Sequence, residues 1–142
     1  MAPLLCLQDE LHNPTVLLGF RSAAHAQAAA LFGGQPSVVT DDGSVGRQAL
    51  VTELLTAELD AGAELAVYAC GPPPMLEAVR ALCAERGVSA QLALESGMAC
   101  GFGACFGCVV PTADGYVRLC LDGPVLDADR LETALFAGAG HS

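Results

Sequence analysis

The sequence is poor in basic residues. Its 142 residues include six Lys and Arg against sixteen Asp and Glu, which gives a formal net charge of −10. A surface of that sign repels the phosphates of nucleic acids and the head groups of anionic lipids. We therefore expect neither nucleic acid nor a membrane surface to be a partner.

Long apolar segments and targeting signals are also missing. No run approaches the roughly eighteen uncharged residues that indicate a membrane helix, and the N-terminus lacks the charged-then-apolar pattern of a signal peptide. Internal repeats and low-complexity linkers are absent as well. With 53% hydrophobic residues, the chain can build a packed core, and we expect a globular cytoplasmic protein.

Cysteine is abundant by contrast. The chain has seven cysteines, an odd number that does not suit a framework of disulfides. In a reducing compartment, clustered thiols indicate metal ligands or redox groups before they indicate disulfides.

Residues 1–95 alternate between strand-like and helix-like segments. Apolar, β-branched runs predict strands at residues 15–20, 37–40, 64–70 and 90–95, and helical spacing predicts helices at 23–32, 47–59 and 73–87. Strands that alternate with helices form parallel sheets covered on both faces. We therefore predict an α/β fold with a parallel sheet covered by helices on both faces.

The amino-acid composition changes after residue 95. Glycine and cysteine dominate from Gly97, and residues 108–120 contain two short strand-like runs around an Asp-Gly turn, which is typical of a β-hairpin. Residues 96–142 are therefore predicted to be a small second module attached directly to the first.

Four cysteines in this module have an informative spacing. Cys100, Cys105 and Cys108 form C-x4-C-x2-C, and Cys120 follows after eleven further residues. This is the plant-type [2Fe–2S] pattern, whereas structural zinc sites more often use two C-x2-C pairs. The glycines between the cysteines would let a loop wrap closely around a cluster. The spacing favours [2Fe–2S], with zinc and unliganded core cysteines as the alternatives.

The remaining three cysteines differ in their predicted roles. Cys6 and Cys83 occupy apolar positions of helical runs, and we expect both to be small core residues. Cys70 ends a predicted strand at the carboxyl edge of the sheet, where open α/β folds bind ligands. Its position is compatible with a site residue and with a packed one.

Three motifs carry a family resemblance. The segments "ACGPPPML" from residue 69, "ESGMACGFGACFGC" from residue 95 and "LCLDGPV" from residue 119 are similar to the electron-transfer subunit of NAD-linked (class 1B) dihydroorotate dehydrogenase, a member of the ferredoxin reductase superfamily. The resemblance extends from residue 1 to about residue 132. It implies that residues 1–95 are a partial NAD-binding domain, a truncated Rossmann-like nucleotide-binding sheet, and that residues 96–142 are a small [2Fe–2S] module.

The resemblance also implies site residues. Carried over position by position, the metal ligands are Cys100, Cys105, Cys108 and Cys120, and the residues near FAD or NAD are Gly19, Arg21, Asp42, Gly43, Cys70, Gly71 and Pro72. Asp42 and Gly43 belong to the segment "DDGS", which also fits an ordinary Asp-Gly turn. Arg21 also fits a solvated surface charge.

The implied function is an electron relay. In this family electrons pass between NAD, FAD, the cluster and the FMN of a dihydroorotate dehydrogenase catalytic subunit, in a heterotetramer that serves pyrimidine biosynthesis. Two alternatives stay open: the subunit of a related NAD(P)H-linked reductase of the sulfide dehydrogenase or hydrogenase type, and a cluster-binding module without turnover. No catalytic residue and no self-contained catalytic centre is expected.

The resemblance is incomplete at the N-terminal end. The flavin barrel, the first strand of the nucleotide domain and its phosphate loop have no counterpart in the sequence, so binding of FAD and NAD by this chain is expected to be impaired. The missing strand would be the central one. We therefore expect either a gap or direct pairing between the strands at 15–20 and 64–70, with residues 3–10 helical.

Overall fold

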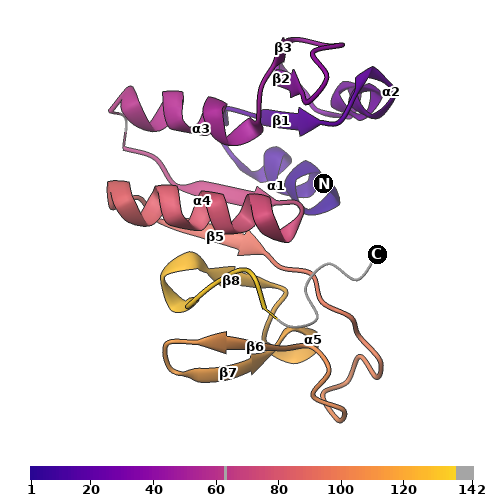
Figure 1. The fold of residues 1–142 in the computed structure, drawn as a ribbon, viewed down its shortest axis with the longest axis vertical. Coiled ribbons are helices and arrows are strands. Elements are labelled where there is room, and N and C mark those ends of the chain that lie inside the picture. Colours follow the sequence, from indigo (N-terminus) through magenta and orange to yellow (C-terminus); the bar gives the residue numbers. More distant parts are fainter. Residues whose placement is uncertain (63, 137–142) are drawn as a thin grey trace. The chain divides into compact units, whose positions relative to one another are not determined.

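The computed structural model of the protein describes residues 1–62 and 64–136. The chain divides into two compact units, Met1–Ala63 and Glu64–Ser142 (Figure 1). Each unit combines strands with helices that pack on them, and the strands that follow one another through a helix are parallel. The predicted α/β class is confirmed.

The first unit is built around a small parallel sheet. Its elements are α1 (Ala2–Glu10), β1 (Leu17–Phe20), α2 (Ala23–Ala26), the 3₁₀ helix η1 (Gln27–Leu31), β2 (Ser37–Thr40), β3 (Arg47–Gln48) and α3 (Val51–Asp60). The strand order is β1-β2-β3. Leu18 and Val39 on the strands and Leu55 and Leu59 on α3 are buried. Burial of this apolar face fixes α3 on the sheet.

Two helices of this unit differ from the prediction. The segment predicted as one helix over 23–32 is a short α-helix followed by a 3₁₀ turn, because tertiary packing, which buries Phe32, overrides the helix preference of its alanines. The helix predicted to begin at residue 47 begins at Val51, since Arg47 and Gln48 pair with β2. The Glu53 side chain then caps the helix by accepting the Leu50 N–H at 2.9 Å.

The second unit holds a three-stranded sheet and a hairpin. Its elements are β4 (Val67–Cys70), α4 (Pro73–Arg86), β5 (Ala90–Ala93), β6 (Val109–Thr112), β7 (Gly115–Arg118), α5 (Leu119–Asp122), β8 (Val125–Asp127) and the 3₁₀ helix η2 (Ala128–Arg130). The sheet order is β4-β5-β8, with β8 antiparallel to β5, and β6 pairs with β7 as the predicted hairpin. The pairing of β8 was not predicted, because three residues carry too short a pattern.

Helix α4 follows its sequence signals closely. Prolines occupy its first turn, and Gly87 ends it in the left-handed conformation with φ +65°, as is typical of helix termini. Leu76, Val79 and Cys83 form its buried face, and Figure 1 shows the helix lying along β4 and β5. The predicted helix over 73–87 is confirmed.

Strands β1 and β4 belong to separate sheets. Within residues 1–62 and 64–136, β1 has β2 as its one strand neighbour, and β4 has β5. Because β1 and β4 fall in different compact units, the gap or direct pairing expected between them stays a prediction. Helix α1 confirms the helix expected over residues 3–10.

The boundary between the two compact units differs from the predicted domain boundary. The division between the compact units falls after residue 63, because β8 pairs with β5 and so draws the segment after residue 95 into the unit of β4 and α4. The assignment of 1–95 and 96–142 to two functional domains stays a prediction, and residues 63 and 137–142 of those ranges lie outside the described residues. Among the residues described, the helices are too short or too polar to cross a membrane.

Candidate metal centre

The predicted cluster ligands lie on one loop and on the short helix that faces it. The loop leaves β5 after Ala93 and returns at β6, projecting from the second unit (Figure 1). Its path needs left-handed backbone at Gly101 (φ +72°), Gly103 (φ +85°) and Phe106 (φ +57°). At Gly103 a side chain would collide with Leu121 of α5. The glycines therefore allow a tight winding that larger residues would resist.

Cys108 and Cys120 form one close pair. Their Sγ atoms are 3.3 Å apart, because the hairpin brings the start of β6 next to α5 and the Leu119 N–H donates to the Cys108 carbonyl. The backbone N–H and the thiol of Cys120 lower the pKa of the Cys108 thiol. The pKa of Cys120 is raised, first of all by its contact with Cys108. Cys108 is therefore the more acidic thiol of the pair.

Cys100 and Cys105 form the second pair. The N–H groups of Cys105 and Phe102, the Cys105 thiol and the Ala104 N–H lower the pKa of Cys100 to about 6. The Cys105 sulfur in turn accepts the Gly107 N–H at 3.3 Å. Backbone donors that converge on a sulfur stabilise its thiolate, which is the form that binds metal.

This arrangement fits a binuclear cluster. A [2Fe–2S] centre takes four thiolates, two on each iron, and the four cysteines lie as two pairs on one loop and its neighbouring helix. A structural zinc ion would instead collect its ligands around one point. Within the described part of the chain, no three His, Cys, Asp or Glu side chains are placed to hold a single ion. Cys108 is buried at 3% exposure, whereas Cys105 is exposed, so the loop has one inner and one outer side.

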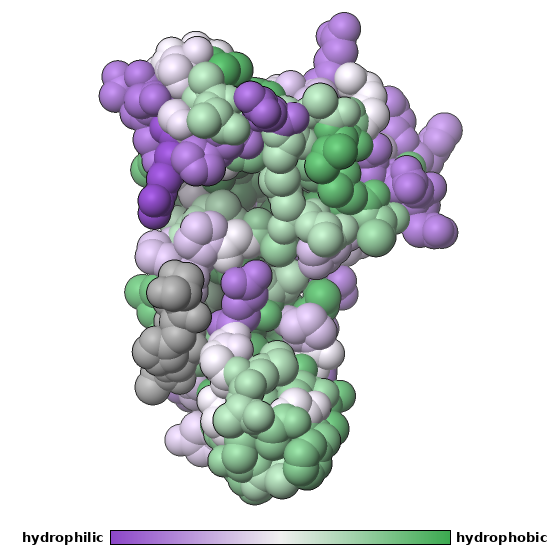
Figure 2. Space-filling model, turned by 90° about the vertical axis from the view of Figure 1, so that its right-hand side faces the viewer, coloured by the Kyte–Doolittle hydropathy of each residue, from purple (hydrophilic) through white to green (hydrophobic). Residues whose placement is uncertain are grey.

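The outer side of the loop is apolar. Phe102 is 70% exposed and Phe106 62%, as expected for residues of an open loop. Figure 2 shows apolar residues covering the lower end of the molecule, where Figure 1 draws the β5–β6 loop. Met98 and Leu121 are further exposed apolar side chains of this region. An apolar surface of this kind marks a site of interaction.

The predicted nucleotide residues of the first unit lie in β1 and just after β1 and β2. Gly19 in β1 leaves no room for a side chain, since a Cβ would lie 2.8 Å from Val51 Cβ. Asp42 accepts both the Ser44 N–H and the Ser44 hydroxyl, which lower the pKa of its carboxyl group. The Ser44 hydroxyl oxygen accepts the Ala23 N–H at 2.7 Å, so the DDGS loop adjoins the segment after Arg21. Gly43 has φ +73°, as a turn requires.

The other three predicted nucleotide residues join β4 to α4. Cys70 ends β4 and is half-buried. Gly71 lies against Met75, whose Sδ would be 2.9 Å from an added Cβ, and Pro72 is the N-cap of α4. Met75 is flexible and could move aside, so packing alone does not require glycine at position 71. Binding of FAD or NAD by these three residues stays a prediction.

The two cysteines predicted to be core residues have different environments. Cys83 is buried against the strands beneath α4, and this burial raises the pKa of its thiol. Cys6 is exposed on α1, so its prediction was wrong. The apolar pattern of α1 is too uniform to identify its inner face, since no residue of that helix is fully buried.

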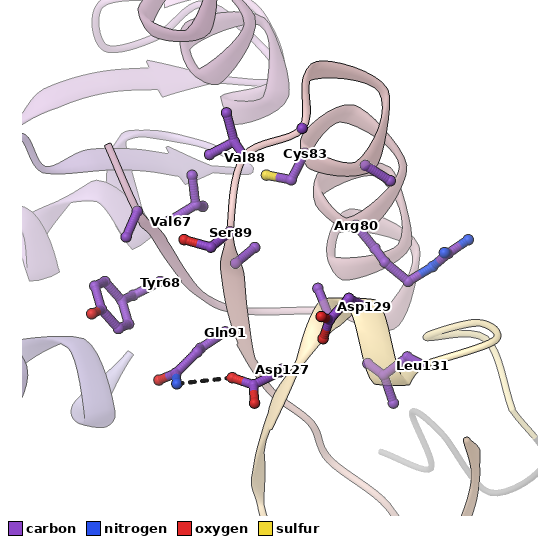
Figure 3. A pocket seen from close by; sticks show the side chains of 15 residues that line it. Val67, Tyr68, Arg80, Cys83, Val88, Ser89, Gln91, Asp127, Asp129 and Leu131 are labelled. Atoms are coloured by element: carbon purple, nitrogen blue, oxygen red, sulfur yellow. Dashed lines mark hydrogen bonds between the residues drawn. The ribbon is translucent and has the colours of Figure 1, made fainter. Parts of the chain in front are cut away.

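A groove lies elsewhere in the second unit. Its volume is about 680 Å³, and it runs between the C-terminal half of α4 and the beginnings of β4 and β5. Figure 3 shows Cys83 pointing toward the strands, Arg80 extending away, and Gln91 joined to Asp127 by a 3.0 Å hydrogen bond. The groove contains none of the predicted site residues.

Two polar residues that matter for this unit were missed from the sequence. The Glu77 carboxylate accepts from Arg80 at 2.6 Å, from the Thr133 hydroxyl at 3.0 Å and from the Ala134 N–H at 2.6 Å, and Arg80 is the main cause of a pKa lowered to about 2. Arg118 contacts the cysteine loop. The bonds of Glu77 to Thr133 and Ala134 have no sequence signal, because these partners lie more than fifty residues further along the chain. The sequence gives one weak indication for Arg118, because it lies two residues before the predicted ligand Cys120.

Comparisons with known proteins agree with this site. Residues 95–132 match the family model described as the iron–sulfur cluster binding domain of dihydroorotate dehydrogenase B, which confirms the predicted type of cofactor. The chain is 36% identical to the dihydroorotate dehydrogenase B (NAD(+)) electron transfer subunit of Caldanaerobacter subterraneus, over 92% of this chain and 55% of that protein. The subunits of Geobacillus thermodenitrificans (40% identical, 89% and 51%) and Listeria monocytogenes (41%, 80% and 45%) are similar. The chain thus spans about half the length of these relatives.

A solved structure supports the fold alone. The structure published as "Insights into flavin-based electron bifurcation via the NADH-dependent reduced ferredoxin-NADP oxidoreductase structure" matches 92% of this chain and 49% of its own, with a TM-score of 0.72 and 24% identity. Its likeness agrees with the predicted ferredoxin reductase type of fold.

Proposed function

Because the chain is homologous to the electron-transfer subunits of dihydroorotate dehydrogenase B, we propose that it is an iron–sulfur electron carrier of that enzyme. It relays electrons between an FAD and NAD site and the FMN of the dihydroorotate dehydrogenase catalytic subunit, in the cytoplasm and in the service of pyrimidine biosynthesis. The assembly that we propose is the heterotetramer of this family.

The arrangement of the thiols carries this proposal. Cys100 and Cys105, and Cys108 and Cys120, supply two thiolates for each of two irons. The bound cluster supplies uptake and release of one electron at a time, which suits a link between two flavins. Backbone N–H groups around Cys100 and Cys105 then offset the negative charge that the sulfurs carry.

The apolar surface of the loop is the proposed docking surface for the catalytic subunit. It is formed by Met98, Phe102 and Phe106. Aromatic side chains are enriched in the buried centres of interfaces, and their burial would exclude water from the cysteine loop.

The residues that we assign to the nucleotide cofactor are taken from the family resemblance. We propose that Gly19, Arg21, Asp42 and Gly43 face the adenosine part of a nucleotide cofactor. Cys70, Gly71 and Pro72 would lie near the nicotinamide and the flavin. The position of Cys70 at the carboxyl end of β4 supports this assignment, because α/β sheets bind ligands beyond that edge.

One experiment tests the relay. The chain is reconstituted anaerobically with iron and sulfide, combined with an FMN-containing dihydroorotate dehydrogenase catalytic subunit, and isolated as a complex. Addition of dihydroorotate should bleach the visible absorption of the cluster, and the reduced protein should give a spin-half EPR signal. The Cys108→Ser variant, which lacks a ligand, should show neither response.

Two outcomes would contradict different parts of the proposal. Stoichiometric zinc without an EPR signal would refute the iron–sulfur centre. A cluster that dithionite reduces but dihydroorotate does not would refute the pathway and favour a related NAD(P)H-linked reductase.

A further inference from the structure

Arg118 contacts the cysteine loop at two points. It ends β7, is half-buried, and lies two residues before Cys120. Its Nη1 donates to the Gly103 carbonyl at 2.9 Å, and its Cζ lies 5.0 Å from the centre of the Phe106 ring. One side chain of the hairpin therefore holds the middle and the far part of the loop.

The first contact acts on a peptide group between two of the predicted ligands. The Gly103 carbonyl and the Ala104 N–H belong to one planar trans peptide, in which the two groups point in opposite directions. By holding the carbonyl, Arg118 therefore fixes the direction of the Ala104 N–H, which lies between Cys100 and Cys105 in the sequence.

The second contact acts on a residue with an unusual backbone. Phe106 has φ +57°, a conformation that non-glycine residues adopt only when their surroundings hold it. The guanidinium over the Phe106 ring, a cation–π contact, holds this stretch of backbone in place.

We propose that Arg118 is a positioning residue of the cluster site, which fixes the backbone N–H groups of the cysteine loop through Gly103 and Phe106 and adds a positive charge beside the loop. This inference rests on the proposed cluster ligands. A reduced cluster carries one more negative charge than an oxidised one, so both effects stabilise the reduced form. Arg118 therefore raises the reduction potential and slows the loss of iron.

Variants of Arg118 separate its two effects. Arg118→Gln removes both the charge and the long guanidinium donor, Arg118→Lys keeps the charge but loses the planar group, and Arg130→Gln is the matched control. Arg130 is exposed in η2 of the same unit. The reduction potential is measured by EPR-monitored titration of the full chain, and iron release by the decay of visible absorption with a chelator.

The expected results differ between the variants. Arg118→Gln should lower the potential and release iron about tenfold faster, the factor expected for losing one hydrogen bond from a charged donor. Arg118→Lys should restore most of the potential but little of the slow release. Arg130→Gln should match the wild type. A potential and a release rate unchanged in Arg118→Gln would overturn the inference.

Hydrogen exchange of the iron-free chain gives a readout that does not need the cluster. Mass spectrometry should show faster exchange of residues 99–107 in Arg118→Gln and no change over α4. Equal exchange in wild type and variant would refute the positioning role even if the variant takes up no iron. Failure of the wild type to bind a cluster would instead refute the proposed function and leave this comparison intact.

Discussion

The DDGS loop of the first unit and the cysteine loop of the second use their polar groups in opposite ways. In the DDGS loop, the Asp42 carboxylate and the Ser44 hydroxyl bond to each other and to the neighbouring backbone. Thr40 closes the same loop by donating to the Val45 carbonyl and accepting the Val45 N–H. Its side chains complete a turn among themselves.

In the cysteine loop the backbone donates inward. N–H groups converge on the sulfurs of Cys100 and Cys105, and the apolar side chains of Phe102 and Phe106 face outward. A loop whose backbone N–H groups surround thiols can bind an anionic group such as a metal–thiolate cluster. A loop whose donors and acceptors already bond to each other has fewer free groups with which to bind a ligand. The difference supports the cluster site more strongly than the nucleotide contacts.

The largest of the effects predicted here should follow removal of one thiol from the predicted cluster ligands. Cys120→Ser takes a ligand from the close pair with Cys108, so the reconstituted chain should lose or distort the EPR signal of the [2Fe–2S] centre. Cys6→Ser, on the exposed face of α1, is the control and should give the wild-type signal. An unchanged spectrum in Cys120→Ser would remove this residue from the ligand set.

The outer face of the loop should account for binding of the partner. Phe102→Asp places a charge on the proposed docking surface and should weaken association with the FMN-containing subunit about tenfold or more, as for a central aromatic contact. Surface plasmon resonance measures the affinity, and visible absorption checks that the cluster is retained. Tyr116→Asp changes an equally exposed aromatic residue of the hairpin and should have little effect.

Charge pairs provide a comparison of stability between the two units. Glu77 is shielded and binds Arg80, Thr133 and Ala134, whereas Arg47 and Glu53 form an exposed pair. We expect Glu77→Gln to lower the free energy of unfolding by about 2 kcal/mol. We expect Glu53→Gln to cost less than about 0.5 kcal/mol. Urea unfolding at neutral pH measures both.

The same carboxylate predicts a pH dependence. The pKa of Glu77 falls from 4.5 to about 2 in the folded chain, chiefly because of Arg80. A depressed folded value means that the stabilisation is complete above the unfolded pKa and disappears as the pH falls through the folded one. Stability should therefore decline between pH 4.5 and 2 in the wild type and less steeply in Glu77→Gln. Parallel curves would contradict this role of Glu77.

The smallest effect is expected in the DDGS loop. The Ser44 hydroxyl is the first cause of the lowered pKa of Asp42, so Ser44→Ala should move that pKa back toward its ordinary value. Carbon-detected NMR of the Asp42 carboxyl group follows the titration. Because the loop is exposed, the change should leave the cluster spectrum untouched. A pKa that does not respond to Ser44→Ala would show that the hydroxyl is not what holds the carboxylate.

Local patterns predicted the elements whose causes lie close together in the sequence. Helix α4 has its prolines and Gly87 as boundaries, and the hairpin of β6 and β7 has its Asp-Gly turn. The cysteine spacing identified the type of cofactor for a similar reason, because a cluster loop is contiguous. The pairs that its thiols form are visible only in three dimensions.

Long-range contacts account for what the sequence could not predict. The pairing of β8 with β5 and the bonds of Glu77 to Thr133 and Ala134 join segments far apart in the chain. The exposure of Cys6 depends on which side of α1 meets the rest of its unit. The role of Arg118 depends on one peptide group of a facing loop.

Strand β8 has a consequence for how the site assembles. Leu94, just after β5, donates its N–H to the Pro124 carbonyl at 2.9 Å, so residues 95–123 form a loop that is closed at its base. All four predicted ligands lie within it. The chain entropy lost on closing a loop of this kind is offset by strand pairing in the sheet. Cys120 is therefore held next to Cys108 by the fold itself, rather than by the group that the four thiols would bind.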